Sequence, residues 1–223
     1  RSTLDKSLTR PFLTNRSPYV GVKYHLKTDH ADPDEIALHN FDQGYCGISR
    51  IENDVFNLCY LTHRSNLKKN GSILEMEENI LGENPFLKRI FTNSEILFDK
   101  PEVINEITFE KKEPVHNHIL MSGDSAGMIT PLCGNGMAMA IHSAKILSEH
   151  IIENLSSGFN RSKLEQDYAR EWNQLLSKRL RAGRKIQGLF GSSIISNSAV
   201  ALGKNFRPFA SYLMKQTHGT PFS

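Results

Sequence analysis

An apolar, strand-like run at residues 118–121 leads into a polar turn, and glycines follow the turn at short intervals. The segment from Ile119 to Leu147 is ILMSGDSAGMITPLCGNGMAMAIHSAKIL. Asp124 carries an acceptor-only side chain that can hold a polyol hydroxyl group. Gly134 and Gly136 let the backbone approach a ligand and open a helix, whose first amides favour a phosphate, a carboxylate or an electron-rich ring. The spacing predicts a pocket for a ligand with both hydroxyl groups and negative charge.

The same segment resembles the second FAD-binding motif of the aromatic-hydroxylase and geranylgeranyl-reductase superfamily, G-D-x-A-x-x-x-x-P-x-x-G-x-G-[MLI]. The marked positions hold Gly123, Asp124, Ala126, Pro131, Gly134, Gly136 and Met137. The resemblance implies that Asp124 binds the ribityl chain of FAD. It also implies that the backbone of Gly134, Asn135, Gly136 and Met137 lies along the flavin ring, where the helix dipole would favour reduction. The cofactor-binding set implied is therefore Gly123, Asp124, Pro131, Gly134, Asn135, Gly136 and Met137. A Gly-rich turn into a purely structural helix is the alternative.

The start of the chain resembles a second feature of these enzymes, a D-G motif followed by Arg-Ser and a helix. Arg1-Ser2-Thr3-Leu4 is similar to that continuation. The family's N-terminal βαβ unit carries G-x-G-x-x-G, which binds the ADP pyrophosphate, and this pattern does not occur in the sequence. We therefore expect the C-terminal part of an FAD-dependent oxidoreductase. Alone, it should purify without FAD, lack activity and self-associate through an uncovered sheet edge.

Residues 44–50 distinguish this chain from two subgroups. Related halogenases carry G-W-x-W-x-I-P on a substrate-domain strand, and geranylgeranyl reductases carry Y-x-W-x-F-P. The strand here keeps an aromatic residue at Tyr45, but Gly47 replaces the second tryptophan and Arg50 replaces the proline. This departure argues against a halogenase and weakens the prenyl-reductase assignment. Phe41, Tyr45 and Tyr60 are candidate substrate-pocket residues, and packing on a sheet face is an equal alternative for them.

The order of elements follows from composition and periodicity. Strands are expected at 19–26, 35–41, 44–51, 55–61 and 103–112, and short polar turns make 35–61 an antiparallel meander. Helices are expected at 65–81, directly after Pro85, at 137–155 and at 162–186, with short helices in the glycine-broken tail after Gln187. The expected fold class is α/β. Residues 1–115 would form a β-rich antiparallel substrate domain, and 116–223 the C-terminal helices of a partial Rossmann-like FAD domain plus a helical tail.

Composition excludes several function classes. The chain has 223 residues, 39% hydrophobic and 23% charged, which is typical of a globular protein. A net charge of +3 is too small to indicate nucleic-acid binding, and the basic run at 178–185 is interpreted as a solvated helix face. No apolar run reaches the ~20 residues of a membrane span. Three cysteines without metal-binding spacing argue against a metal site and favour a reducing, cytoplasmic location.

The function indicated is an FAD-dependent oxidoreductase of the monooxygenase or double-bond reductase type. Its substrate would be a small or lipophilic organic molecule, with NAD(P)H or a protein as electron donor. No Ser-His-Asp or paired-carboxylate arrangement is evident, so no catalytic side chain is assigned, and the flavin would carry the reaction. Cys133 is interpreted as a small apolar filler rather than a redox thiol. A non-enzymatic binding module that keeps the fold without the cofactor is the alternative function.

Overall fold

The computed structural model describes residues 3–15, 17–189, 198, 201–202 and 205–218. The chain divides into two compact units, which we call the sheet unit and the helical unit. The sheet unit is Asn15–Thr108 with Leu189–Ala199, and the helical unit is Ser2–Thr14 with Phe109–Gly188 and Val200–Ser223. The assignment of residues 1–115 and 116–223 to a substrate and a cofactor domain stays a prediction. Arg1 and Ser2, which begin the expected D-G continuation, lie outside the described residues.

An antiparallel sheet forms the framework of the sheet unit, with the strand order β2-β3-β4-β1-β5 and β6 also paired to β1. The strands are β1 Tyr19–Lys27, β2 Ala37–Phe41, β3 Gly44–Arg50, β4 Phe56–His63, β5 Glu95–Ile96 and β6 Glu102–Ile107. Consecutive strands β2, β3 and β4 form the expected meander. The strand expected at 103–112 ends early because β1, its partner, begins at Tyr19, which pairs with Ile107. Beyond that pair, no strand within the described part of the chain pairs with residues 108–112.

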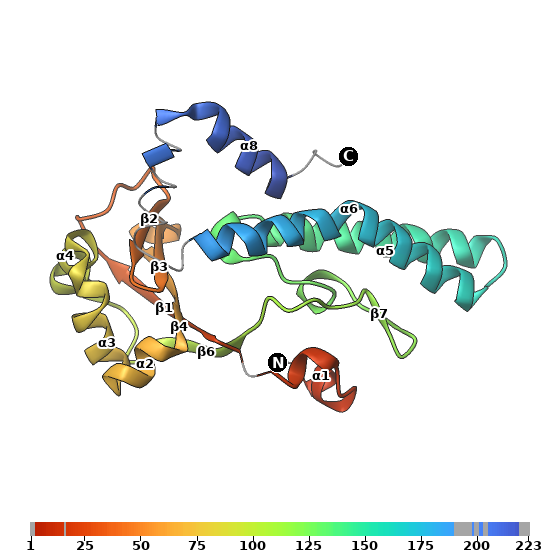
Figure 1. Cartoon of the computed structure of the whole chain (residues 1–223), viewed down its shortest axis with the longest axis horizontal. Helices are drawn as coiled ribbons and strands as arrows, with labels where there is room; N and C mark the ends of the chain where they lie inside the picture. Colours follow the sequence, from red (N-terminus) through yellow and green to blue (C-terminus); the bar gives the residue numbers. More distant parts are fainter. Residues whose placement is uncertain (1–2, 16, 190–197, 199–200, 203–204, 219–223) are drawn as a thin grey trace. The chain divides into compact units, whose positions relative to one another are not determined.

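Three short helices cover one face of this sheet: α2 Arg64–Asn70, α3 Ile73–Asn79 and α4 Pro85–Asn93 (Figure 1). Side chains alternate between the two faces of a strand, and one set of alternate residues packs under these helices. The buried cluster joins Val20, Val22, Leu26, Ile48 and Leu58 from the strands to Met76, Leu81, Leu87 and Ile90 from the helical layer. Burial of this apolar surface, worth about 25 cal/mol per Å², is the main stabilisation of the sheet unit.

The prediction of a single helix at 65–81 is wrong, because the chain turns between α2 and α3. Gly71 has a φ of 83°, which favours glycine, and its amide donates to the Leu67 carbonyl at 3.0 Å to end α2. Ser72 then caps α3, since its hydroxyl accepts from the amide of Glu75 at 3.1 Å. A Ser-x-x-Glu capping box directly after a glycine therefore ends one helix and starts another. The helix expected after Pro85 is confirmed as α4, capped by Asn84.

A buried carboxylate lies between α3 and the sheet. Glu77 Oε1 accepts hydrogen bonds from the hydroxyl of Tyr24 at 2.9 Å and from that of Tyr60 at 2.7 Å. Burial raises the pKa of the Glu77 carboxyl above its ordinary value of 4.5, and the two hydroxyl donors lower it in part. Burial and the neighbouring carboxylate raise the pKa of both tyrosines. The folded state therefore retains a proton on Glu77 to higher pH than the unfolded chain does.

Glu77→Gln is expected to change how stability depends on pH. A carboxyl whose pKa is raised by folding contributes stability that is full below the unfolded pKa and is lost as pH rises through the folded pKa. The wild-type protein should therefore lose stability relative to Glu77→Gln as pH rises from the ordinary carboxyl pKa of 4.5 through the raised pKa of the folded state, as measured by urea unfolding followed by circular dichroism. Glu78→Gln, an exposed change on the same helix, should show the same dependence of stability on pH as the wild type. A constant difference between wild type and Glu77→Gln would contradict this expectation.

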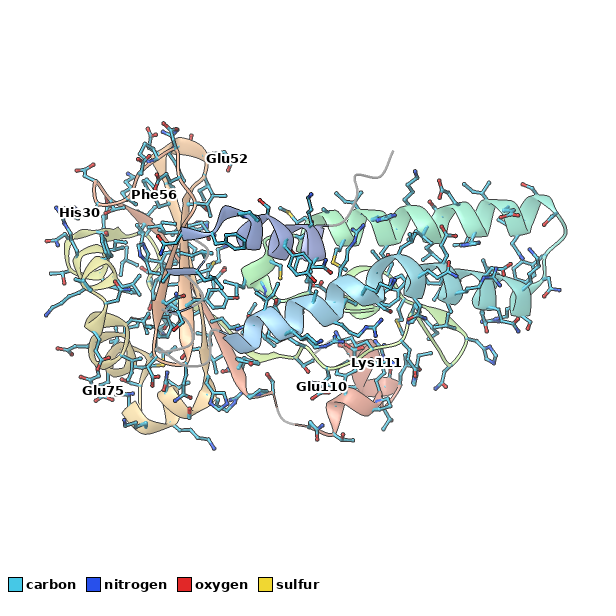
Figure 2. All side chains as sticks on the ribbon, turned by 45° about the horizontal axis from the view of Figure 1, so that its top comes forward. His30, Glu52, Phe56, Glu75, Glu110 and Lys111 are labelled. Carbon is cyan, nitrogen blue, oxygen red and sulfur yellow. The ribbon has the colours of Figure 1, made fainter. Side chains whose placement is uncertain are left out.

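The helical unit consists of α1 Thr3–Ser7, β7 Val115–His116, β8 Ile119–Leu120, α5 Gly136–Ser156, α6 Arg161–Leu189 and α8 Arg207–His218. Periodicity predicted both helices, and α5 and α6 run antiparallel beside each other (Figures 1 and 2). Their facing sides bury Met139, Ile146, Tyr168, Trp172, Leu176 and Leu180. None of the helices in the described part of the chain combines the length and apolarity needed to cross a membrane.

Strand β8 delivers the chain to the Gly123-Asp124 turn, and it pairs with β7 in a two-stranded antiparallel sheet. Every strand pair among the described residues is antiparallel. The α/β fold class with an antiparallel sheet is thus confirmed. The partial Rossmann-like character of the second half stays a prediction, because a parallel sheet is the feature that would define it.

Candidate functional site

The glycine-rich segment of the helical unit passes through two single turns before it enters α5. After β8, a 3₁₀ turn spans Gly123–Ser125 and a second spans Pro131–Cys133. Gly123 and Gly134 have φ values of 58° and 63°, a left-handed conformation that glycine adopts without strain. A side chain built at Gly134 would meet no atom of the described residues within 4 Å. The backbone conformation therefore favours glycine there, and the backbone stays open on that side.

The start of α5 follows at once and is also open. Asn135 occupies the N-cap position but makes no side-chain cap; its amide group donates to the carbonyl of Thr217 at 2.9 Å instead. Met137, in the first turn, has 83% of its surface exposed. The first amides of a helix lack partners within the helix and lie at its positive dipole end. This helix start can therefore receive an electron-rich or anionic group.

Asp124 lies exposed in the first turn of the segment. Its backbone carbonyl accepts a hydrogen bond from Lys112 Nζ at 2.7 Å. Burial of part of the residue raises the pKa of its carboxyl, and the positive charge of Lys112 acts in the opposite direction. Burial likewise lowers the pKa of Lys112, while Asp5 and Asp124 oppose that change. The pair fixes the turn at its backbone and leaves the Asp124 carboxylate as an acceptor toward solvent.

A buried serine on α5 holds the turn against both long helices. Ser143 Oγ accepts from the amide of Gly123 at 3.2 Å and from Trp172 Nε1 at 3.1 Å, and Ser122 Oγ lies 3.1 Å away. Beside it, the hydroxyl of Tyr168 donates to the carbonyl of Met121 at 2.5 Å. These bonds connect the residues before Asp124 to two helices. They therefore set where the Asp124 turn can lie.

A buried arginine holds the same turn from the N-terminal segment. Arg10 is 2% exposed, and its guanidinium donates to Asp5 Oδ1 at 3.0 Å. It also donates to the carbonyl of Ser125 at 2.7 Å and to that of Glu113 at 3.2 Å. Its charge lies 5.0 Å from the ring centroid of Phe12. Neither Arg10 nor Ser143 belongs to a sequence pattern that marks it, because both act through segments distant in the chain.

Cys133 lies where a small filler was expected. It is buried, with its sulfur 3.2 Å from Thr130 Oγ1. Burial raises the pKa of the thiol, and the bond to Thr130 opposes that in part. A raised pKa disfavours the reactive thiolate. The arrangement supports the packing role over the redox role.

The three candidate substrate residues do not share one face of the sheet. Phe41 and Tyr60 lie in edge-to-face contact, with ring centroids 6.2 Å apart, on the face under the helices. Tyr60 is bonded there to Glu77. Cys46 pairs with Tyr60 across the strands, so Tyr45, one position earlier, points to the other face. Tyr45 is buried as well. The structure thus joins Phe41 and Tyr60 in a core and separates Tyr45 from them.

Comparison with known proteins finds solved structures with a similar fold. No family model matches the chain. A variant of the halogenase PltM in complex with FAD superposes with a TM-score of 0.67 at 13% identity, over 98% of this chain and 49% of that one. The flavin-dependent brominase Bmp2 superposes with a TM-score of 0.65 at 16% identity, over 90% of this chain and 50% of that one. Klebsiella pneumoniae HpxO, complexed with FAD and uric acid, superposes with a TM-score of 0.63 at 13% identity, over 92% of this chain and 54% of that one.

These likenesses establish the fold as one found in flavin-dependent monooxygenases and halogenases. The chain spans about half the length of the solved structures that it matches. At this level of identity the similarity concerns the fold, and function must be argued from the site.

Proposed function

We propose that this chain supplies the ribityl–flavin side of the FAD site of an oxidoreductase. The observation that carries the proposal is the segment from Gly123 to Met137. It combines an exposed carboxylate, an unobstructed left-handed glycine and a helix start without a side-chain cap. The presence of FAD in two of the similar structures supports the same assignment. Bound FAD would supply the redox chemistry.

The hydrogen-bond donors and acceptors of the segment fit the ribityl–flavin half of FAD. Asp124 can accept hydrogen bonds from ribityl hydroxyl groups. The open backbone at Gly134 and the first amides of α5, at Gly136 and Met137, can lie against the electron-rich edge of the ring. The helix dipole would stabilise negative charge on the reduced cofactor. Pro131 and Asn135 belong to this set by holding the loop, Asn135 through its bond to Thr217.

The reaction that we propose is monooxygenation or double-bond reduction of a small or lipophilic organic substrate, with electrons from NAD(P)H or a protein donor. The similarity to flavin-dependent monooxygenases supports the first. The reductase type depends on the motif resemblance alone, and Gly47 and Arg50 depart from that subgroup's strand pattern. Phe41, Tyr45 and Tyr60 remain candidates for the substrate region, with Tyr45 on a different face from the other two.

Flavin binding by the chain tests the proposal. Only the ribityl–flavin half of FAD would contact these residues, so FMN and FAD should bind the full chain with similar affinity, as measured by the change in flavin fluorescence. Asp124→Ala should weaken the binding of FMN and of FAD by about 10–150-fold, because a charge-assisted hydrogen bond is worth roughly 1.5–3 kcal/mol. Asp124→Asn, which keeps an acceptor, should fall between this variant and the wild type.

The matched control is Glu153→Ala, which removes an exposed carboxylate near the far end of α5. Its FMN affinity should equal that of the wild type. Flavin affinity that is unchanged in Asp124→Ala would remove Asp124 from the site. No flavin binding at millimolar FMN would contradict the proposal and favour a binding module without cofactor.

A further inference from the structure

A second pocket of the helical unit lies along α6 and involves none of the proposed flavin-binding residues. Its volume is about 370 Å³, and residues 110–112 line one side of it while the middle of α6 lines the other. Figure 2 labels Glu110 and Lys111 on the first of these walls. Asn173, Ser177, Arg181 and Arg184 recur at helical spacing on the second wall. We call this the α6 pocket.

Positive charge dominates the α6 pocket. Lys111, Lys112, Arg181 and Arg184 line it, and Glu110 is the acidic residue among its lining side chains. Lys112 is engaged elsewhere, since its amine bonds the Asp124 carbonyl and lies over the Phe12 ring. Arg184 donates to the Phe109 carbonyl at 3.4 Å. Burial and the like charge of Arg181 lower the pKa of Arg184, against the opposing effect of Glu110. The charge of Arg181 thus acts unfavourably on Arg184, and an anion bound beside both would offset that effect.

The floor of the pocket is apolar. A side chain built at Gly127 would come within 2.6 Å of Leu180 Cδ1 and 3.0 Å of Trp172 Cη2, so the glycine backbone lies directly against both. Trp172 points its only polar atom away from this floor, because Nε1 donates to Ser143. Leu180 and Trp172 are only 5% and 2% exposed, so a ligand seated here would lie on the Gly127 backbone, with these two side chains directly behind it and cations at the sides. Polar groups that fix orientation over an apolar surface are typical of small-molecule sites of about 300–1,000 Å³.

We propose that the α6 pocket binds a small planar organic anion. Its carboxylate or phosphate would lie between Arg181 and Arg184, whose planar guanidinium groups match both kinds of oxyanion. Its apolar body would lie on the Gly127 backbone, in front of the buried side chains of Leu180 and Trp172. This site does not depend on flavin binding, because neither its walls nor its floor belong to the proposed flavin-binding set.

Trp172 provides the measurement, because it is the single tryptophan of the chain. We would titrate the full chain with benzoate, phenyl phosphate and the neutral benzamide, and follow tryptophan emission. At least one of the two anions should give a saturable change, at least tenfold tighter than benzamide. Tighter binding of phenyl phosphate would indicate a phosphate ester as the ligand, and tighter binding of benzoate a carboxylate. Equal affinity for benzamide, or no saturable change with any of them, would overturn the proposal.

Variants on α6 separate this pocket from general positive charge. Arg181→Gln/Arg184→Gln should weaken anion binding at least tenfold. Lys178→Gln/Lys185→Gln removes the same charge from exposed positions of the same helix outside the pocket, and should change affinity less than twofold. Ser177→Phe, which fills the pocket and keeps its charges, should also abolish binding while far-UV circular dichroism stays unchanged. Equal weakening by both double variants, or unaltered binding in Ser177→Phe, would contradict a built site.

Discussion

Arg10→Met is expected to lower the free energy of unfolding of the helical unit by about 3–5 kcal/mol, the usual cost of breaking a buried ion pair. The guanidinium is almost fully buried and bonds Asp5 and the carbonyls of Glu113 and Ser125. Methionine retains much of the side-chain volume but none of these donors. The buried carboxylate of Asp5 would lose its cationic partner, and the Asp124 turn would lose its anchor at Ser125.

Urea unfolding followed by Trp172 emission measures this loss, because the single tryptophan belongs to the helical unit. Lys6→Met, an exposed neighbour, is the control and should change the free energy by less than about 0.5 kcal/mol. The double variant Asp5→Leu/Arg10→Met should be more stable than Arg10→Met, since removal of both charges avoids a buried carboxylate that has lost its ion pair with Arg10. An Arg10→Met protein as stable as Lys6→Met would show that the buried pair contributes nothing.

Trp172→Ala should have an effect of similar size, about 3–5 kcal/mol, because it removes a large aromatic side chain from a packed core. Trp172 is 2% exposed and packs with Tyr168, Leu176 and Leu180. Trp172→Phe keeps most of the ring and loses the bond to Ser143, so its cost should be smaller, about 0.5–1.5 kcal/mol. The ratio of the two effects separates packing from hydrogen bonding at this position.

Circular dichroism at 222 nm during urea unfolding is the measurement here, since these variants lack the fluorescent probe. Gln174→Ala, an exposed change two residues along α6, should stay within about 0.5 kcal/mol of the wild type. If Trp172→Phe were as destabilised as Trp172→Ala, the hydrogen bond to Ser143 rather than the packed ring would be the source of stability.

Local patterns in the sequence were sufficient for the elements with strong periodicity. Alternating β-formers separated by polar turns predicted the meander of β2, β3 and β4, because a hairpin is specified by its own turn and flanking residues. Apolar residues at helical spacing predicted α5 and α6 to within a few residues. The break at Gly71 was missed because the apolar pattern continues across it. The capping pair Ser72 and Glu75 was the local signal that could have revealed it.

The sequence by itself determined the chemistry of the glycine-rich segment, because glycine, aspartate and a helix start within a short stretch act through the backbone that carries them. Only the tertiary structure decided what holds that segment in place. Arg10 and Ser143 meet it from segments distant in the chain, and such contacts leave no local pattern. The structure likewise decided that Phe41 and Tyr60 lie against Glu77 while Tyr45 points to the opposite face. Strand register sets the face of every side chain, and register depends on which strands pair. The α6 pocket, too, exists only because residues 110–112 fold back against α6; in the sequence the same arginines indicate no more than a solvated helix face.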